Sequence, residues 1–180
     1  MKVLLIASLI SSMVIYRSNI YNDVPLKNIE LLKYVEKNGK SLAPTYEKTN
    51  CVEFLDKVLT DFSNIDEKTS ERIYINYDLK RVKKFLYRGD STVVSGVCWA
   101  LVSCNKARWV SPSDVKIGDI VQYWSTDMGF INGHCGVICG EDKTGYLLYS
   151  SHQDSKGFGV MQVKNKTLYP NTKFFIVRLN

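Results

Sequence analysis

The sequence predicts one α+β domain in which helices come first and an antiparallel β-sheet follows. Apolar residues recur at helical spacing in the first half of the chain. After Trp109 the pattern changes to short apolar runs separated by Gly, Asn and Asp turns. The 180 residues are 45% hydrophobic and 23% charged, a globular composition, and no linker or repeat divides the chain.

Four helices are expected from the spacing of the apolar residues. They cover residues 28–37, 51–62, 78–87 and 97–104, and the first should stop at Asn38-Gly39. A short extended piece is expected at Ile73-Tyr74-Ile75.

Five strands are expected in the second half, each next to turn residues. They cover residues 120–124, 137–138, 146–151, 160–163 and 174–179. Close spacing of such short strands favours antiparallel pairing, which completes the α+β order.

The N-terminus has the pattern of a secretory signal peptide. Lys2 precedes an uncharged run from Val3 to Tyr16, and these 14 residues fall short of the about 20 that a membrane span needs. We therefore expect residues 1–16 to be a leader or a short membrane anchor, and residues 17–180 to be an exported domain, periplasmic or extracellular. A strand or helix buried in the domain is the alternative for this run.

The charge balance favours an anionic partner. The chain has 24 basic and 18 acidic residues, a net charge of +6. Cell-wall polymer or a membrane surface would attract such a protein. Nucleic acid is not expected, because the lysines are spread along the chain and the one dense run, at 80–84, suits the solvated face of a helix.

The five cysteines, an odd number, leave at least one free thiol if no other chain supplies a partner. They are Cys51, Cys98, Cys104, Cys135 and Cys139. Cys135 and Cys139 would be roughly 13 Å apart on a strand, too far for one tetrahedral ion or one disulfide. No metal or other cofactor is expected.

Cys51 is the candidate nucleophile. Asn50 precedes it as a good N-cap residue, and Glu53 follows three positions after Asn50, as in a capping box. Cys51 should then lie in the first turn of a helix, where the helix dipole lowers the pKa of a thiol. The alternative is a small buried residue with no chemistry.

His134 is the candidate base, since a thiol nucleophile needs a group to take its proton. The sequence has only two histidines, His134 and His152. Glycines at 133 and 136 would allow a substrate and the Cys51 helix to approach closely. By strand alternation His134 should face the site while Cys135 packs behind it.

Three segments in this order resemble the papain-like cell-wall hydrolases of the NlpC type. They are the Cys-bearing 50–54, the Gly-Asp strand 118–124 and the Gly-His strand 133–138. A fourth, 149–153 followed by the Gly-Phe-Gly at 157–159, resembles the strand that carries the third catalytic residue. The 67 residues between Cys51 and Gly118 suit relatives with extra helices between nucleophile and sheet.

The resemblance implies a papain-like fold, with the nucleophile helix packed on the C-terminal antiparallel sheet. It also implies a third catalytic residue, for which His152 is our prediction and Ser151 and Gln153 are the alternatives. Cys98 is the rival nucleophile, although it lacks a capping pair. The expected activity is cleavage of amide bonds in peptidoglycan peptides through a thioester, by a monomer without cofactor. The alternatives are a non-catalytic module that binds cell wall or protein, and an acyltransferase with the same Cys-His pair.

Overall fold

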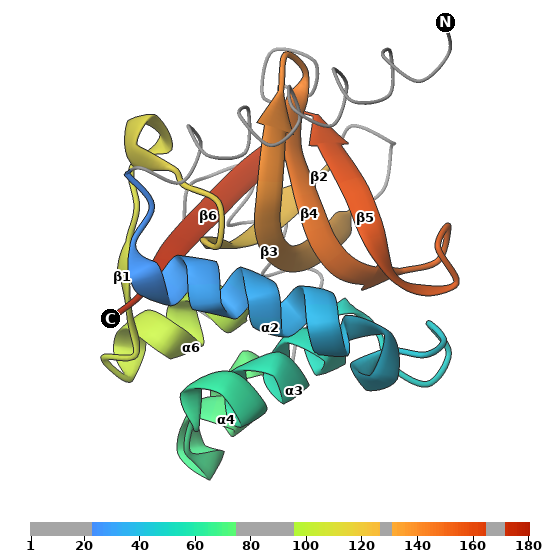
Figure 1. The fold of residues 1–180 in the computed structure, drawn as a ribbon, viewed down its shortest axis with the longest axis horizontal. Coiled ribbons are helices and arrows are strands. Elements are labelled where there is room, and N and C mark those ends of the chain that lie inside the picture. Colours follow the sequence, from blue (N-terminus) through green and yellow to red (C-terminus); the bar gives the residue numbers. More distant parts are fainter. Residues whose placement is uncertain (1–22, 75–95, 127–130, 165–171) are drawn as a thin grey trace, which may run out of the picture.

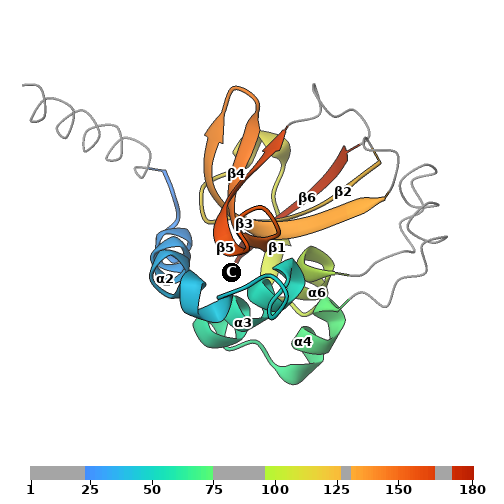
Figure 2. The same cartoon turned by 90° about the vertical axis from the view of Figure 1, so that its right-hand side faces the viewer.

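A computed structural model describes residues 23–74, 96–126, 131–164 and 172–180. The predicted leader, the predicted helix at 78–87 and the basic run at 80–84 lie outside these ranges. In the described part the helices gather on one side of a β-sheet, and both views agree on this arrangement (Figure 1, Figure 2). None of the helices in the described ranges is long and apolar enough to cross a membrane.

The described residues form four α-helices and a six-stranded antiparallel sheet, so the predicted α+β class and its order are confirmed. The sheet has the order β1-β6-β2-β3-β4-β5. The helices are α2 (Leu26–Leu42), α3 (Cys51–Ser63), α4 (Glu67–Ile73) and α6 (Val97–Ser103), with a 3₁₀ turn η1 at Pro112–Asp114. The strands are β1 (Ala107–Trp109), β2 (Ile120–Ser125), β3 (Asn132–Asp142), β4 (Gly145–His152), β5 (Gly157–Lys164) and β6 (Thr172–Leu179).

Two local predictions are wrong. Ile73 is not extended but is the last residue of α4. Helix α2 does not stop at Asn38-Gly39 but continues to Leu42. Gly39 does not end the helix. It allows the helix to pack closely on the sheet, because a Cβ there would lie 2.3 Å from the Phe158 ring on β5. The missing side chain therefore brings this turn of α2 against the sheet.

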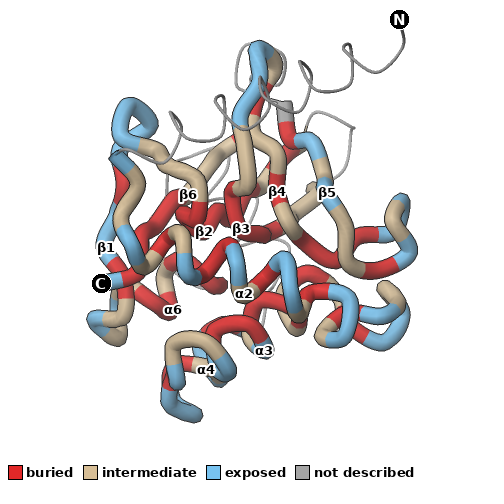
Figure 3. Tube along the Cα trace, in the orientation of Figure 1, coloured by how far each residue is buried: buried red, intermediate tan, exposed pale blue. Residues whose placement is uncertain are grey.

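The sheet buries apolar residues on both faces, and Figure 3 shows that most of the buried chain lies where helices and strands meet. One core lies between the helices and the face of the sheet that carries Ile120, Cys135 and Val137. The second lies on the other face, around Val121, Tyr123, Ile138, Leu148 and Ile176. Alternate residues of one strand therefore enter different cores, which explains why these strands are apolar throughout.

A buried ion pair fixes the start of β2 against the end of β6 and the start of α2. Asp119 is fully buried and accepts hydrogen bonds from Arg178 Nε at 2.7 Å and Nη2 at 2.8 Å. The side-chain amide of Asn28 donates to the same carboxylate at 2.8 Å. Gly118, with φ of +82°, makes the turn that brings Asp119 here, and a Cβ at Gly118 would meet Asn28. The Gly-Asp pair of the sequence thus has a structural role.

Candidate active site

Cys51 is the first residue of α3, as predicted, and the capping box is present. Asn50 Oδ1 accepts hydrogen bonds from the N–H groups of Val52 at 2.9 Å and Glu53 at 3.1 Å. The N–H of Asn50 in turn donates to Glu53 Oε2 at 2.8 Å. The cap holds the thiol at the positive end of a 13-residue helix, and the helix N–H groups that it engages are those of Val52 and Glu53, not that of Cys51.

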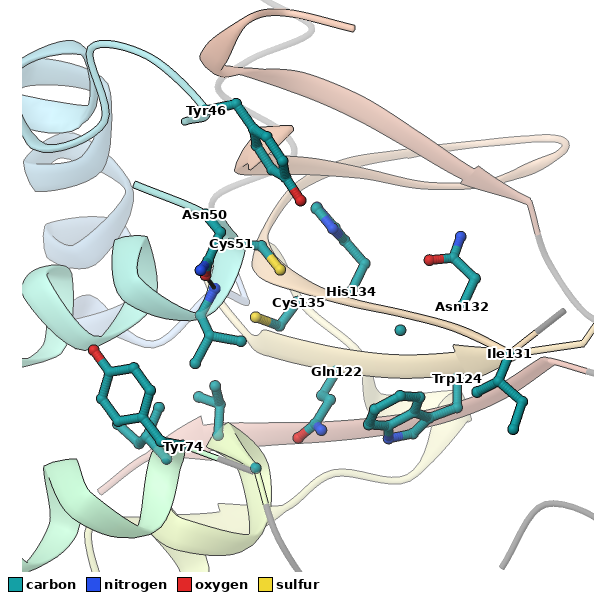
Figure 4. A pocket seen from close by; sticks show the side chains of 15 residues that line it. Tyr46, Asn50, Cys51, Tyr74, Gln122, Trp124, Ile131, Asn132, His134 and Cys135 are labelled. Atoms are coloured by element: carbon teal, nitrogen blue, oxygen red, sulfur yellow. Dashed lines mark hydrogen bonds between the residues drawn. The ribbon is translucent and has the colours of Figure 1, made fainter. Parts of the chain in front are cut away.

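The thiol of Cys51 opens into a cavity of about 400 Å³ between the helices and the sheet. Cys51 and His134, the two residues predicted to form the reacting pair, both line it, and Figure 4 shows them on either side of the same space. Its other lining residues come from the segment before α3, from α3, α4 and α6, and from β2 and β3: Tyr46, Asn50, Val52, Ile73, Tyr74, Gly96, Val97, Gln122, Trp124, Ile131, Asn132, Gly133 and Cys135.

The surroundings of Cys51 lower the pKa of its thiol well below its usual value, to about 4. The largest cause is a hydrogen bond with the Cys135 side chain, followed by a hydrogen bond with His134 and the charge of that ring. Burial opposes these effects, because it disfavours the thiolate. The lowered pKa favours the thiolate of Cys51, the form in which a cysteine is a nucleophile.

Cys135 lines the cavity beside Cys51, which corrects the prediction that it packs behind the site. It is on the face of β3 that the helices cover, and its sulfur faces that of Cys51 across the cavity (Figure 4). The hydrogen bond with Cys51, together with burial, raises the pKa of Cys135 well above the usual value for a thiol. Of the two thiols, Cys51 is thus the more acidic and Cys135 the less acidic.

His134 is oriented by Ser150, which the sequence analysis did not select. Ser150 Oγ lies 2.7 Å from the carbonyl oxygen of Cys135 and 2.9 Å from His134 Nε2. A hydroxyl has one hydrogen, and the carbonyl can only accept, so Ser150 donates to Cys135 and accepts from His134 Nε2–H. This assignment leaves Nδ1 of His134 as the ring nitrogen for Cys51.

A bulge in β3 decides which residues of β4 lie near His134. The pairing runs from Asp142↔Gly145 to Gly140↔Leu147, then shifts by one residue to Ile138↔Leu148 and Val137↔Tyr149. The regular pairing ends at Val137 and Tyr149. Beyond this point the carbonyl of Cys135 receives a hydrogen bond from the side chain of Ser150.

The three residues predicted for the third position make other contacts. His152 is buried at the end of β4, and its Nδ1 accepts a long hydrogen bond of 3.4 Å from the N–H of Ser155. Burial and the nearby His134 ring lower the pKa of His152. Ser151 donates to the carbonyl of Thr49 at 2.5 Å, which ties β4 to the segment before Cys51. Gln153 is exposed in the turn after β4.

Cys98, the rival nucleophile, has no access to solvent. It is fully buried in α6, and its thiol donates to the carbonyl of Phe175 at 3.3 Å. Burial raises the pKa of this thiol far above neutral pH, so it stays protonated. All five cysteines are free thiols. Within the described ranges, no three His, Cys, Asp or Glu side chains are arranged to hold a metal ion.

Two aromatic residues of the cavity also escaped the sequence analysis. Tyr46 points its hydroxyl into the cavity near His134 (Figure 4), and burial and the negative charge of Cys51 raise its pKa. Trp124 lies over bare backbone, since a Cβ at Gly133 would be 2.5 Å from its ring. Nothing in the sequence around Tyr46 indicates its place in the cavity. For Trp124 the signal is Gly133, since a glycine beside His134 indicates that another group packs closely on the backbone there.

Comparison with known proteins adds no relative: no protein-family model, no curated protein and no solved structure matches this chain.

Proposed function

We propose that this protein is a cysteine-dependent amide hydrolase with a papain-like arrangement of the NlpC type. The observation that carries the proposal is that Cys51 and His134 line one cavity, while the buried Ser150 holds the His134 ring from behind. Cys51 has a thiol pKa of about 4, and His134 lines the same cavity and is among the groups that lower this pKa. Ser150 accepts from the far nitrogen of the ring at 2.9 Å. A nucleophile, a base and a group that orients the base are the parts that acyl transfer requires.

The proposed reaction begins with attack by the Cys51 thiolate on an amide carbonyl. A C–S bond forms, the carbonyl π electrons move to oxygen, and a tetrahedral intermediate results. His134 gives a proton from Nδ1 to the leaving nitrogen as the C–N bond breaks, which leaves a thioester on Cys51. His134 then takes a proton from water, which attacks the thioester and releases the acid and the thiolate.

The N–H of Cys51 is the proposed donor to the oxyanion. The cap uses the N–H groups of Val52 and Glu53, so the N–H of Cys51 remains for the substrate oxygen. A donor fixed by a capped helix needs no reorganisation as charge develops on oxygen, and one such donor contributes about 3–4 kcal/mol in comparable enzymes.

Peptides of peptidoglycan are the proposed substrate class. The resemblance of segments 50–54, 118–124 and 133–138 to cell-wall hydrolases supports it, as does the net charge of +6, which suits an anionic polymer. We also propose that the protein acts outside the cytoplasm, where peptidoglycan lies, and that it is a monomer.

Release of amines from purified sacculi tests this function. We expect the full chain to release new amino groups, and the Cys51→Ala variant to release none. Cys139→Ala is the matched control, because Cys139 is a half-buried thiol outside the cavity and should retain activity. Circular dichroism would verify that each variant is folded. Undiminished release by Cys51→Ala would refute the proposal.

A further inference from the structure

We propose that Cys51 and Cys135 form a reversible disulfide when a hydroperoxide oxidises the site, and that this modification switches the protein off. The two sulfurs belong to different elements, the start of α3 and the middle of β3. The effect of the disulfide on activity rests on the proposed hydrolase function, whereas the formation of the disulfide does not.

The two thiols lie next to each other in the cavity. Both are free, both line the cavity, and their sulfurs point toward one another (Figure 4). Each thiol also shifts the pKa of the other, which is lowered for Cys51 and raised for Cys135. The proposed nucleophile and resolving thiol are thus neighbours in one cavity, and bond formation requires their sulfurs to approach to a bonding distance of about 2 Å.

The other three cysteines have partners elsewhere. Cys98 donates to the Phe175 carbonyl at 3.3 Å, and Cys139 donates to the Leu147 carbonyl at 3.3 Å. Cys104 lies near Arg72, at 3.6 Å. Neither Cys98, Cys104 nor Cys139 lines the cavity. Cys135 is therefore the thiol placed to react with an oxidised Cys51.

The disulfide forms in two steps, with the hydroperoxide as the oxidant. The Cys51 thiolate attacks a peroxide oxygen, so that an S–O bond forms and the O–O bond breaks. Two electrons pass from sulfur to the peroxide, and the departing hydroxide or alkoxide takes a proton from water. The Cys135 sulfur then attacks the sulfenic sulfur of Cys51. An S–S bond forms, the S–O bond breaks, and the hydroxide leaves with the Cys135 proton as water.

The first oxidation prepares Cys135 for the second. In the reduced site Cys135 stays protonated, and the main causes of its raised pKa are its hydrogen bond to Cys51, burial and the charge of Cys51. A sulfenic acid is neutral, so the charge of Cys51 disappears when it is oxidised. Cys135 then ionises more readily and attacks, before Cys51 can advance to the irreversible sulfinic acid.

The test treats the full chain with hydrogen peroxide and maps every cysteine by mass spectrometry, without and with a reductant. We expect a cross-linked peptide pair that contains Cys51 and Cys135, the loss of two thiols per molecule, and recovery of both thiols on reduction. Oxidation of Cys51 to sulfinic acid without the cross-link, or a cross-link from Cys51 to another cysteine, would overturn the proposal.

Two substitutions at the resolving position and one control complete the test. In Cys135→Ser and Cys135→Ala, Cys51 should advance to sulfinic acid and the reductant should no longer restore it. Cys139→Ser, which can keep the hydrogen bond to Leu147, should behave as the unmodified chain. Because the readout is the mass of peptides, the disulfide can be found even if the chain releases no amine from sacculi. A Cys51–Cys135 disulfide in a protein that releases no amine would refute the proposed function and support the redox pair.

Discussion

The hydroxyl of Ser150 lies 2.9 Å from His134 Nε2 and gives its only hydrogen to the Cys135 carbonyl, 2.7 Å away. Ser150 therefore acts on His134 as an acceptor. It fixes the ring with Nε2 protonated, and it directs Nδ1 to the side on which Cys51 lies. A neutral hydroxyl orients the ring without the charge that an aspartate would add.

We predict that Ser150→Ala lowers kcat/KM about tenfold, mainly through kcat. The substitution removes one hydrogen bond to His134, and the loss of a bond of this kind costs about 0.5–1.5 kcal/mol. The folded protein also loses the partner of the Cys135 carbonyl, so its melting temperature should fall as well. Steady-state kinetics on a soluble peptide substrate, with thermal melting in parallel, would measure both.

His152→Gln is the comparison for that variant, since His152 is our sequence-based prediction for the same role. We expect its kcat/KM to stay within about threefold of the unmodified protein, because among the described contacts its Nδ1 bonds to Ser155. A larger loss in His152→Gln than in Ser150→Ala would instead favour His152 as the third residue.

The choice of the third residue marks the limit of sequence reasoning. A count along the two strands from the turn between β3 and β4, made on the assumption of regular pairing, would put Tyr149 or Ser151 at this position. The bulge between Ile138 and Gly140 shifts the register by one residue, so Ser150 takes the face of His134 and Ser151 turns to the helices. Nothing in the sequence marks that extra residue, because apolar residues on both faces of the sheet hide the alternation.

What the sequence could predict depended on local signals. The Asn50–Glu53 capping box predicted the start of α3, because both partners lie within one turn. The extent of α2 was not predictable, since Gly39 packs against Phe158, a residue far along the chain. The contact of Cys135 with Cys51 likewise depends on how α3 lies on β3, which is a tertiary property.

Alkylation of Cys51 should depend on pH as a thiolate of pKa about 4 would. The rate follows the thiolate fraction, so it should be nearly constant above about pH 5 and should fall as the pH drops through about 4. An ordinary thiol, with a pKa near 8.5, would be less than about 1% ionised at pH 6. Iodoacetamide labelling, read for each cysteine by mass spectrometry, would give the profile.

A Cys104→Ser background sharpens the alkylation experiment. Cys104 is half-buried, and a hydrogen bond from Thr69 is the main cause that lowers its pKa, so it can react as well. A profile for Cys51 that rises steadily to pH 8 or beyond would mean that the site does not activate the thiol. It would then favour a binding module over an enzyme.

Asn50→Ala should destabilise the protein by about 1 kcal/mol and also slow alkylation of Cys51 at pH 6. The substitution removes the cap that holds the first turn of α3. Asp66→Ala is the matched control, because Asp66 caps the separate helix α4 through the N–H of Thr69. We expect a similar loss of stability without a change in alkylation. Equal slowing in both variants would show that reactivity follows global stability.

Asp119→Ala should destabilise the fold by about 3–5 kcal/mol, since it leaves Arg178 buried without its main partner. The exposed pair between Lys106 and Asp66 is the comparison, and Lys106→Met should cost less than about 1 kcal/mol. Urea denaturation would measure both free energies of unfolding. Similar losses in the two variants would mean that the buried pair adds little beyond a surface contact.

The most direct test of Cys51 as the nucleophile is a titration of activity against its modification. Samples of the Cys104→Ser protein would be alkylated to increasing extents at pH 6, with the modified fraction of Cys51 counted by mass spectrometry and amine release measured on the same sample. We predict that activity falls in proportion to unmodified Cys51 and reaches zero when every Cys51 is alkylated. Activity that persists in fully alkylated protein would contradict the assignment.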